Sequence, residues 1–359
     1  METREGAARL LVPDVPRRKG PGTKGPWPFY NGTMAVSRDL SALVLAKWPR
    51  PLGSVLDGLA ATGIWGIRMA LEADLRRVAF NDRSPPATDL IRANLDLNGL
   101  TGDVLEGELS VRLSERPYDF VDIDPFGPPT PFLDVALEAA QRGSGLGITA
   151  TDTAVLCGTY PVACERRYGS CPMRGPQGGE IGLRILLGYC ARLAAANGKS
   201  VRPILAFGAE HFLRVQLIVE TDPGSTEVAM LSRLDAGAFG PVRAEDRMAI
   251  GPLWRGTLGD ARIIRRLSPS PWTSVRSARL LSLLQGECEL PPFFVTTDEL
   301  ASREHGSPPK LDRFLEGLRS IGYRAARTHF HPRGVKTDAP YADIVRVFRE
   351  RMPSGPRDD

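Results

Sequence analysis

Several features are scarce or missing in this 359-residue chain, and each absence excludes a class of protein. The chain has five cysteines, an odd number, and no two of them form the CxxC pair typical of zinc and redox sites. No apolar run approaches the roughly 18 residues of a membrane helix, and the first residues lack the charged-then-apolar order of a signal peptide. We therefore expect a cytoplasmic, intracellular protein with reduced cysteines, no bound metal and no contact with a membrane.

The G-x-G-x-x-G fingerprint of dinucleotide-binding loops is also missing, although the chain has a related pattern. Residues 54–63 predict a buried strand that runs into a glycine-bearing loop and then a helix. Backbone can approach a ligand closely at Gly58 and Gly63, and the helix terminus presents free N–H groups. Asp57 precedes the loop, and Asp82 ends the second strand, where an acid typically binds ribose hydroxyls.

The acids of this pattern bear on the choice between two cofactors. Nicotinamide and S-adenosylmethionine enzymes both use a strand, a glycine loop and a helix in this order. Asp57 can pair with the amino group of a methionine moiety, and Glu108, after the third strand, can accept from an adenine amine. Because the dinucleotide fingerprint is absent, we favour S-adenosylmethionine. Each acid taken singly is better explained as a capping or surface carboxylate, and only the set together favours the cofactor.

Short apolar strands alternate with helical segments from residue 54 onward. Expected strands are 54–59, 77–80, 103–105, 118–123 and 146–149, and expected helices are 34–48, 64–73, 87–97, 110–115, 132–141 and 179–197. Such alternation predicts a parallel sheet covered on both faces. Strands at 200–207 and 212–220 are close enough for an antiparallel hairpin. A mostly parallel, Rossmann-like α/β sheet with such a hairpin is the plan of the class I S-adenosylmethionine-dependent methyltransferase fold.

The chain is long enough for two domains. Residues 1–26 contain Arg17-Arg18-Lys19 and four prolines with little apolar periodicity, so we expect a mobile or loosely docked basic arm. Residues 27–222 would form the methyltransferase domain. Residues 223–359 would form a smaller α+β domain, with helices at 298–305 and 310–321 and a helix or strand at 344–351.

The most informative motif is Asp124-Pro125-Phe126-Gly127, which follows the apolar run 118–123. Open α/β sheets bind ligands just beyond the carboxyl ends of their strands, so these residues would face a ligand. The carboxylate and the carbonyl of Pro125 can accept hydrogen bonds from a planar amine, and Phe126 can stack on a heterocycle. This set suits the exocyclic amine of a nucleobase, whereas the alternative is a simple strand-ending turn.

Basic residues are mostly arginine, whose planar fork suits contacts with phosphates and bases, and the net charge is +4. In the second half, Arg324, Arg327, Arg333 and Lys336 are interleaved with Thr328-His329-Phe330-His331, a composition that suits nucleic-acid binding. A solvated surface face is the alternative. The two alternating histidines fit a strand or loop better than a metal site.

A series of segments in fixed order covers nearly the whole chain. They are Phe29-Tyr30-Asn31, Ser37-Arg38-Asp39-Leu40, DGLAATGIWGIR, NDRSP, DFVDIDPFG, TPFLDVAL, TATDTAVLCG, RRYG, GLRILL, GPLW and RTHFHPRGVKTDAP. Together they resemble the tRNA guanine-26 N2-dimethyltransferases of archaea and eukaryotes. The length and order of the matches make a chance likeness very improbable.

The resemblance implies transfer of one or two methyl groups from S-adenosylmethionine to N2 of guanine 26 in tRNA. It implies tRNA as the partner, and no protein partner is evident. By motif, the expected cofactor-binding residues are Phe29, Arg38, Asp57, Gly58, Gly63, Asp82, Glu108 and Leu109, and those acting on guanine are Asp124, Pro125 and Phe126. Amino methylation of another nucleobase and a catalytically inert tRNA-binding protein are the alternatives.

Some positions depart from the family pattern. Gly32-Thr33 stands where the family usually has Pro-Arg, Trp65 where it has arginine, and Glu108-Leu109-Ser110 where it has Asp-Ala-Asn. Most members also carry paired cysteines for zinc near the GPLW segment. Residues 221–287 contain no cysteine, so we expect no zinc.

Overall fold

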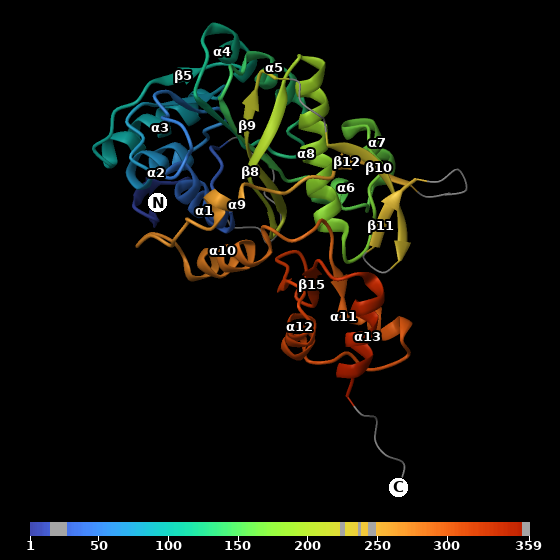
Figure 1. Cartoon of the computed structure of the whole chain (residues 1–359). Helices are drawn as coiled ribbons and strands as arrows, with labels where there is room; N and C mark the ends of the chain where they lie inside the picture. Colours follow the sequence, from blue (N-terminus) through green and yellow to red (C-terminus); the bar gives the residue numbers. More distant parts are fainter. Residues whose placement is uncertain (15–26, 223–226, 236–237, 243–248, 354–359) are drawn as a thin grey trace.

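The computed structural model describes residues 1–14, 27–222, 227–235, 238–242 and 249–353, and a seven-stranded sheet lies at its centre (Figure 1). The sheet has the order β5-β4-β3-β6-β7-β9-β8. Its strands are β3 (Val55–Asp57), β4 (Val78–Asp82), β5 (Val104–Glu106), β6 (Phe120–Ile123), β7 (Gly145–Ala150), β8 (Ser200–Ala209) and β9 (Phe212–Glu220). β3 to β7 are parallel, and β9 pairs antiparallel with both β7 and β8. This topology confirms the predicted parallel sheet with an antiparallel hairpin.

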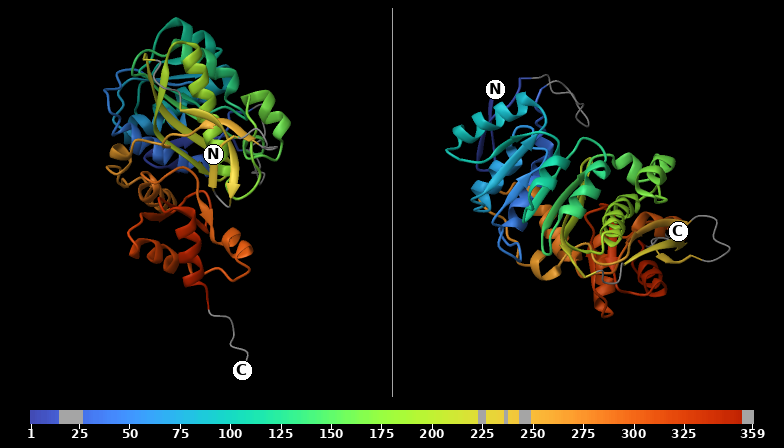
Figure 2. Two further views of the ribbon diagram at one scale, coloured as in Figure 1. Left: turned by 45° about the vertical axis from the view of Figure 1, so that its right-hand side comes forward. Right: turned by 90° about the horizontal axis from the view of Figure 1, so that it is seen from above.

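Two clusters of buried apolar side chains lie on the two faces of this sheet, which is covered on each side. One cluster includes α4 (Leu109–Glu115), α5 (Thr130–Ala139) and α8 (Gly178–Ala196), and the other α1 (Ala35–Leu45), α2 (Ile64–Glu72) and α3 (Pro85–Leu97). Along β3, Val55 joins the second cluster and Leu56 the first, as the alternation of a strand requires. Figure 2 shows the helices on either side of the sheet from above.

Three short helices connect these elements: η1 (Gly32–Met34), α6 (Thr153–Leu156) and α7 (Pro161–Tyr168). The sequence-predicted helices and strands recur with ends shifted by a few residues, and the strand predicted at 212–220 matches β9. Hydrophobic periodicity therefore located the elements of the central sheet well. None of the helices in the described residues is sufficiently long and apolar to cross a membrane.

The amino-terminal residues differ from the expected loose arm. Residues 2–11 form a two-stranded antiparallel hairpin of β1 (Glu2–Glu5) and β2 (Ala8–Leu11). Ala8, Leu10 and Val12 are buried in the cluster of α1, α2 and α3. Four-residue strands are too short to show a clear period, so no sequence pattern predicted the hairpin. The Arg17-Arg18-Lys19 run lies outside the described residues.

The boundary expected at residue 223 also differs from the packing. β10 (Val228–Asp235), β11 (Ala238–Pro241) and β12 (Ala249–Trp254) form a sheet of their own. Leu231, Leu253 and Trp254 join the cluster of α8. α9 (Ala261–Ile264) and α10 (Val275–Glu287) add Ile264 and Leu284 to the cluster of α1. Residues up to about 290 therefore complete the cores of the large sheet.

A separate core begins at residue 295 and forms the C-terminal unit, which lies below the rest of the molecule in Figure 1. Its elements are β13 (Val295–Thr296), α11 (Thr297–Arg303), α12 (Leu311–Ser320), β14 (Ala325–Arg327), β15 (Gly334–Thr337) and α13 (Tyr341–Arg351). The strands form an antiparallel sheet of order β13-β15-β14. The unit is α+β, as the sequence predicted, but smaller.

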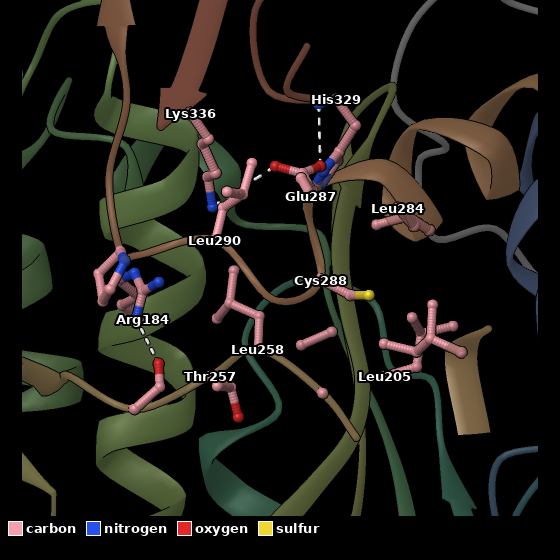
Figure 3. Close-up of a pocket in the computed structure, with 15 residues that line it drawn as sticks. Arg184, Leu205, Thr257, Leu258, Leu284, Glu287, Cys288, Leu290, His329 and Lys336 are labelled. Carbon is pink, nitrogen blue, oxygen red and sulfur yellow. Dashed lines mark hydrogen bonds and ion pairs between the residues drawn. The ribbon is translucent and has the colours of Figure 1, made fainter. Parts of the chain in front are cut away.

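Buried charges join the C-terminal unit to the rest of the molecule (Figure 3). Lys336 of β15 donates to Glu180 of α8 at 3.1 Å and lies 3.4 Å from Glu287 of α10. Glu287 also bonds the ring of His329, whose other nitrogen accepts from the backbone N–H of Gly208 at 3.2 Å. A cavity of about 30 Å³ beside these side chains has room for about two water molecules.

Candidate active site

Four carboxylates gather at the carboxyl ends of adjacent strands of the large sheet. Asp57 ends β3, Asp82 ends β4, Asp122 is in β6, and Asp124 follows β6. Burial, and then the negative charge of Asp122, raises the pKa of Asp57 well above its usual value, although a 3.0 Å bond from the backbone N–H of Gly66 opposes the shift. Such a concentration of negative charge favours a cationic ligand.

The glycine loop between β3 and α2 has the shape that the sequence predicted. Gly58 donates its N–H to the carbonyl of Asp122 at 2.9 Å, and a Cβ there would lie 2.7 Å from that oxygen. Gly63 begins α2 with a φ of 76°, a left-handed value that suits glycine. Ala61 donates its N–H to Asp82 at 2.9 Å. The loop therefore presents backbone, rather than side chains, beside Asp82.

The Asp124-Pro125-Phe126 segment combines a half-buried carboxylate with an exposed ring. Burial raises the pKa of Asp124, whereas the charges of Arg214 and Arg38 and a hydrogen bond from Thr149 oppose the rise. Pro125 is buried, and the ring of Phe126 is 47% exposed. Phe126 meets the ring of Phe29 edge to face, with centroids 4.6 Å apart. The structure therefore places the ring of Phe29 beside the Asp124-Pro125-Phe126 segment, so these four predicted residues lie together.

Arg38 lies among ion pairs rather than in an open pocket. Its guanidinium donates two bonds of 2.6 Å to the carboxylate of Glu5 and one of 2.9 Å to the carbonyl of Asn31. Despite burial, the charges of Arg38 and Arg68 lower the pKa of Glu5. The amino-terminal hairpin thus supplies the partner of Arg38, which the sequence did not predict.

Glu108 and Leu109 lie at the start of α4 in different surroundings. Glu108 is exposed and forms a 3.3 Å ion pair with the equally exposed Arg83. Leu109 is buried and packs against the backbone of Gly58. Glu108 therefore lies at the surface in an ion pair, whereas Leu109 packs beneath the glycine loop.

The positions that depart from the family pattern have structural roles. Trp65 is buried and stacks on Phe120 of β6 at a centroid distance of 5.9 Å. Thr33 donates its backbone N–H and its hydroxyl to Asn31, at 3.0 Å and 2.7 Å, and so closes the turn of η1. Trp65 fills the core beneath the site and does not line it.

Sequence reasoning missed a buried polar group behind the carboxylates. Arg214 of β9 forms an ion pair with Asp122, and both side chains are 1% exposed. Burial outweighs the opposing charge of Arg214 and raises the pKa of Asp122 to about 6. The available signal was an arginine within the apolar run FLRVQLIVE, which interrupts the strand pattern.

The residues of the predicted basic patch do not share one surface, because three of them are exposed and the fourth is buried. Three of its arginines reach the surface, and each pairs with an acid: Arg324 with Asp338, Arg327 with Asp312 and Arg333 with Asp298. Lys336 is only 3% exposed and is held by Glu180 and Glu287. Its predicted contact with a phosphate is therefore wrong for this structure, because its ammonium group lies inside the protein.

The strand tips fit S-adenosylmethionine by the chemistry of their groups. Asp57 and Asp82 accept hydrogen bonds from backbone N–H groups rather than from arginine side chains, which suits a cationic sulfonium and amino group nearby. Both oxygens of Asp82 accept backbone N–H groups at 2.9 Å, which fixes the orientation of this carboxylate. Within the described ranges, no group of three or more His, Cys, Asp or Glu side chains is arranged to hold a metal ion.

The strand order and the acidic strand tips define a class I methyltransferase fold. The model of the family described as N2,N2-dimethylguanosine tRNA methyltransferase matches residues 6–233 and 242–349. The chain belongs to this family, as the resemblance of its motifs predicted.

Individual relatives match along nearly their whole length. The tRNA (guanine(26)-N(2))-dimethyltransferase of Thermococcus kodakarensis is 37% identical over 379 residues, covering 96% of this chain and 98% of the relative. That of Pyrobaculum aerophilum is 35% identical and covers 98% and 97%. The solved structure of Trm1 from Pyrococcus horikoshii with S-adenosyl-L-methionine is 33% identical, has a TM-score of 0.85 and covers 99% and 100%.

Proposed function

We propose that this protein transfers methyl groups from S-adenosyl-L-methionine to the exocyclic N2 of guanine 26 in tRNA, giving the mono- and then the dimethylated base. Membership of the family and the full-length relatives of that name support this reaction. The observation that carries it is the Asp124-Pro125-Phe126 segment, where a half-buried acceptor adjoins an exposed ring. Because tRNA is the substrate, we place the reaction in the cytoplasm.

The chemistry requires an acceptor because the lone pair of the guanine amine is conjugated with the ring. In our proposal, the Asp124 carboxylate and the Pro125 carbonyl accept from N2 and favour a pyramidal nitrogen. N2 then forms a bond to the methyl carbon while the carbon–sulfur bond breaks, and Asp124 takes the proton that N2 loses. Phe126, with Phe29 beside it, receives the base once it has left its stack.

S-adenosylmethionine supplies an electrophilic methyl group next to these acceptors. We assign Asp57 to its amino group, Asp82 to its ribose hydroxyls and Glu108 to its adenine amine, with Gly58, Gly63 and Leu109 forming the backbone cradle. Phe29 would close the pocket. Arg38 would act at longer range, since Glu5 and Asn31 already occupy most of its donors.

The tRNA surface that we propose includes Arg324, Arg327 and Arg333, which are exposed on the C-terminal unit. Each would exchange its acidic partner for a phosphate, so binding should weaken with salt. Lys336 would act indirectly, by holding the C-terminal unit against α8.

The test is nucleoside mass spectrometry of an unmodified tRNA transcript incubated with the purified protein and S-adenosylmethionine. The expected products are N2-methylguanosine and N2,N2-dimethylguanosine at position 26, and none in a matched transcript with adenosine at that position. A methyl group found on another base would show that the protein methylates that base instead of guanine 26. Binding of tRNA and donor without transfer would identify an inert tRNA-binding protein.

A further inference from the structure

A buried polar strip crosses the sheet on the face that α1 covers. Arg214 of β9 bonds Asp122 of β6 with one nitrogen and also donates to Ser41 of α1 at 3.2 Å. Its second nitrogen donates to the hydroxyl of Thr149 in β7 at 2.9 Å. Gln216, two residues further along β9, donates to Ser41 at 3.1 Å. This strip lies inside the protein, so it does not serve solubility.

A glycine makes the crossing possible. β7 lies between β6 and β9, and Gly147 of β7 pairs with Asp122 on one side and Gln216 on the other. A Cβ at Gly147 would lie 2.4 Å from a carboxylate oxygen of Asp122 and 2.6 Å from a guanidinium nitrogen of Arg214. Only an unsubstituted residue leaves room for the ion pair to pass over the intervening strand.

The strip ends at the proposed acceptor. The Thr149 hydroxyl accepts from Arg214 at 2.9 Å and also lowers the pKa of Asp124, so the arginine and the carboxylate share this hydroxyl as a neighbour. Charged groups from each element around Asp124 act on it or on its neighbours: Asp57 of β3, Asp82 of β4, Asp122 of β6, Arg214 of β9 and Arg38 of α1. Among these, the two arginines oppose three neighbouring acids.

We propose that Arg214 is a positioning residue for methyl transfer, which holds Asp122 and Thr149 on either side of Gly147 and through them orients Asp124. This inference rests on the proposed function. Burial disfavours the charged form of Asp124, which must nevertheless accept a proton from N2. The charge of Arg214 opposes this effect from a side chain that is itself buried.

The pH dependence follows from the sign of this effect. Arg214 lowers the pKa of Asp124, so its loss raises that pKa. Activity requires the ionised form and disappears as the pH falls through this pKa. Weakening the contact should therefore move the acidic limb of the kcat profile to higher pH, while the KM for tRNA stays unchanged.

Two variants test the proposal from different ends of the strip. Arg214→Lys retains a charge but loses the fork that reaches both Asp122 and Thr149. Thr149→Val leaves the Asp122–Arg214 pair in place and removes only the connecting hydroxyl. We expect each to move the acidic limb upward by roughly one pH unit and to lower kcat at pH 7 about tenfold. Arg202→Gln, which removes a half-exposed arginine of β8, is the matched control.

The measurements are kcat as a function of pH at saturating tRNA and donor, the KM values from titrations of each substrate, and thermal melting of each variant. Unchanged acidic limbs in folded Arg214→Lys and Thr149→Val would overturn the proposal, as would a rise in KM alone. Should Arg214→Lys fail to fold because Asp122 loses its partner, the Thr149→Val profile decides by itself. Absence of guanine methylation by the unaltered protein would instead overturn the proposed function.

Discussion

At the scale of single residues, the proposed chemistry depends on a few buried side chains whose ionisation responds to their surroundings. Asp57, Asp122 and Asp124 are all drawn toward their neutral forms by burial. Sequence reasoning found Asp57 and Asp124 because each follows an apolar strand. It missed Asp122 and Arg214, since partners in β6 and β9 are about 90 residues apart in the chain and no local pattern relates them.

Replacement of the proposed acceptor should abolish transfer and leave the fold intact. Asp124→Asn keeps the shape of the side chain but removes the base, so we expect kcat to fall at least about a hundredfold. The dissociation constants for tRNA and S-adenosylmethionine, measured by filter binding and calorimetry, should stay within about twofold of those of the unaltered protein. The control is Asp89→Asn, which changes an exposed acid of α3. Near-normal turnover by Asp124→Asn would remove this carboxylate from the reaction.

Gly147→Ala should be severely destabilising for a steric reason. The new methyl group would collide with Asp122 and Arg214, and backbone on both sides leaves no room to shift. We expect a loss of about 3 kcal/mol or more in the free energy of unfolding. The comparison is Gly286→Ala in α10, where the nearest atom would be 3.7 Å away and a helical alanine is favourable. Equal urea midpoints for the two variants would contradict this account.

At the scale of elements, the amino-terminal hairpin packs against the helices next to the candidate site and bonds them through Glu5. Glu5 of β1 accepts from Arg38 of α1 at 2.6 Å and from Arg68 of α2 at 3.0 Å. Arg68 also bonds Asp39 and Glu72. The hairpin thereby connects two helices that cover one face of the sheet, a role that the basic and proline-rich composition of residues 1–26 did not suggest.

Loss of this connection should be costly. Glu5→Gln leaves two buried arginines short of a charge, and we expect the free energy of unfolding to fall by about 3 kcal/mol. Glu2→Gln, in the same strand as Glu5, removes an exposed ion pair with Arg9 of β2 and should cost under about 1 kcal/mol. Urea unfolding of both variants distinguishes them. Equal midpoints would show that the Glu5 network contributes no more than a surface pair.

At the scale of the whole molecule, the large sheet was predictable because its strands and helices repeat regular periods. The unit boundary was not, because β10 to β12 and α10 are ordinary amphipathic elements whose partners lie far back in the chain. The role of Lys336 was misassigned for a related reason. A basic residue among arginines is indistinguishable in sequence from a surface residue, whereas its acidic partners, Glu180 and Glu287, come from α8 and α10.

The junction of the two units should make the protein sensitive to acid. Although burial opposes it, the charges of His329 and Lys336 lower the pKa of Glu287 to about 2, from 4.5. A lowered pKa stabilises the fold above pH 4.5, and this stabilisation is lost as the pH falls from 4.5 toward 2. We expect Glu287→Gln to be less stable at pH 7 but to lose less further stability between pH 6 and pH 3.

Urea unfolding at several pH values measures this difference. The control is Glu289→Gln, which removes a more exposed acid two residues away. Parallel pH profiles for unaltered protein and Glu287→Gln would show that the junction does not titrate in this range.

The contact between α10 and α1 has a consequence for synthesis on the ribosome. Asp39 of α1 accepts from the backbone of Ser274 at 3.1 Å and from the hydroxyl of Ser277 at 2.6 Å, more than 230 positions later in the chain. The growing polypeptide must therefore emerge from the exit tunnel as far as Ser277 before this early helix obtains its cover. Until then the apolar surface of α1 stays exposed, where it can bind chaperones or associate prematurely with other chains.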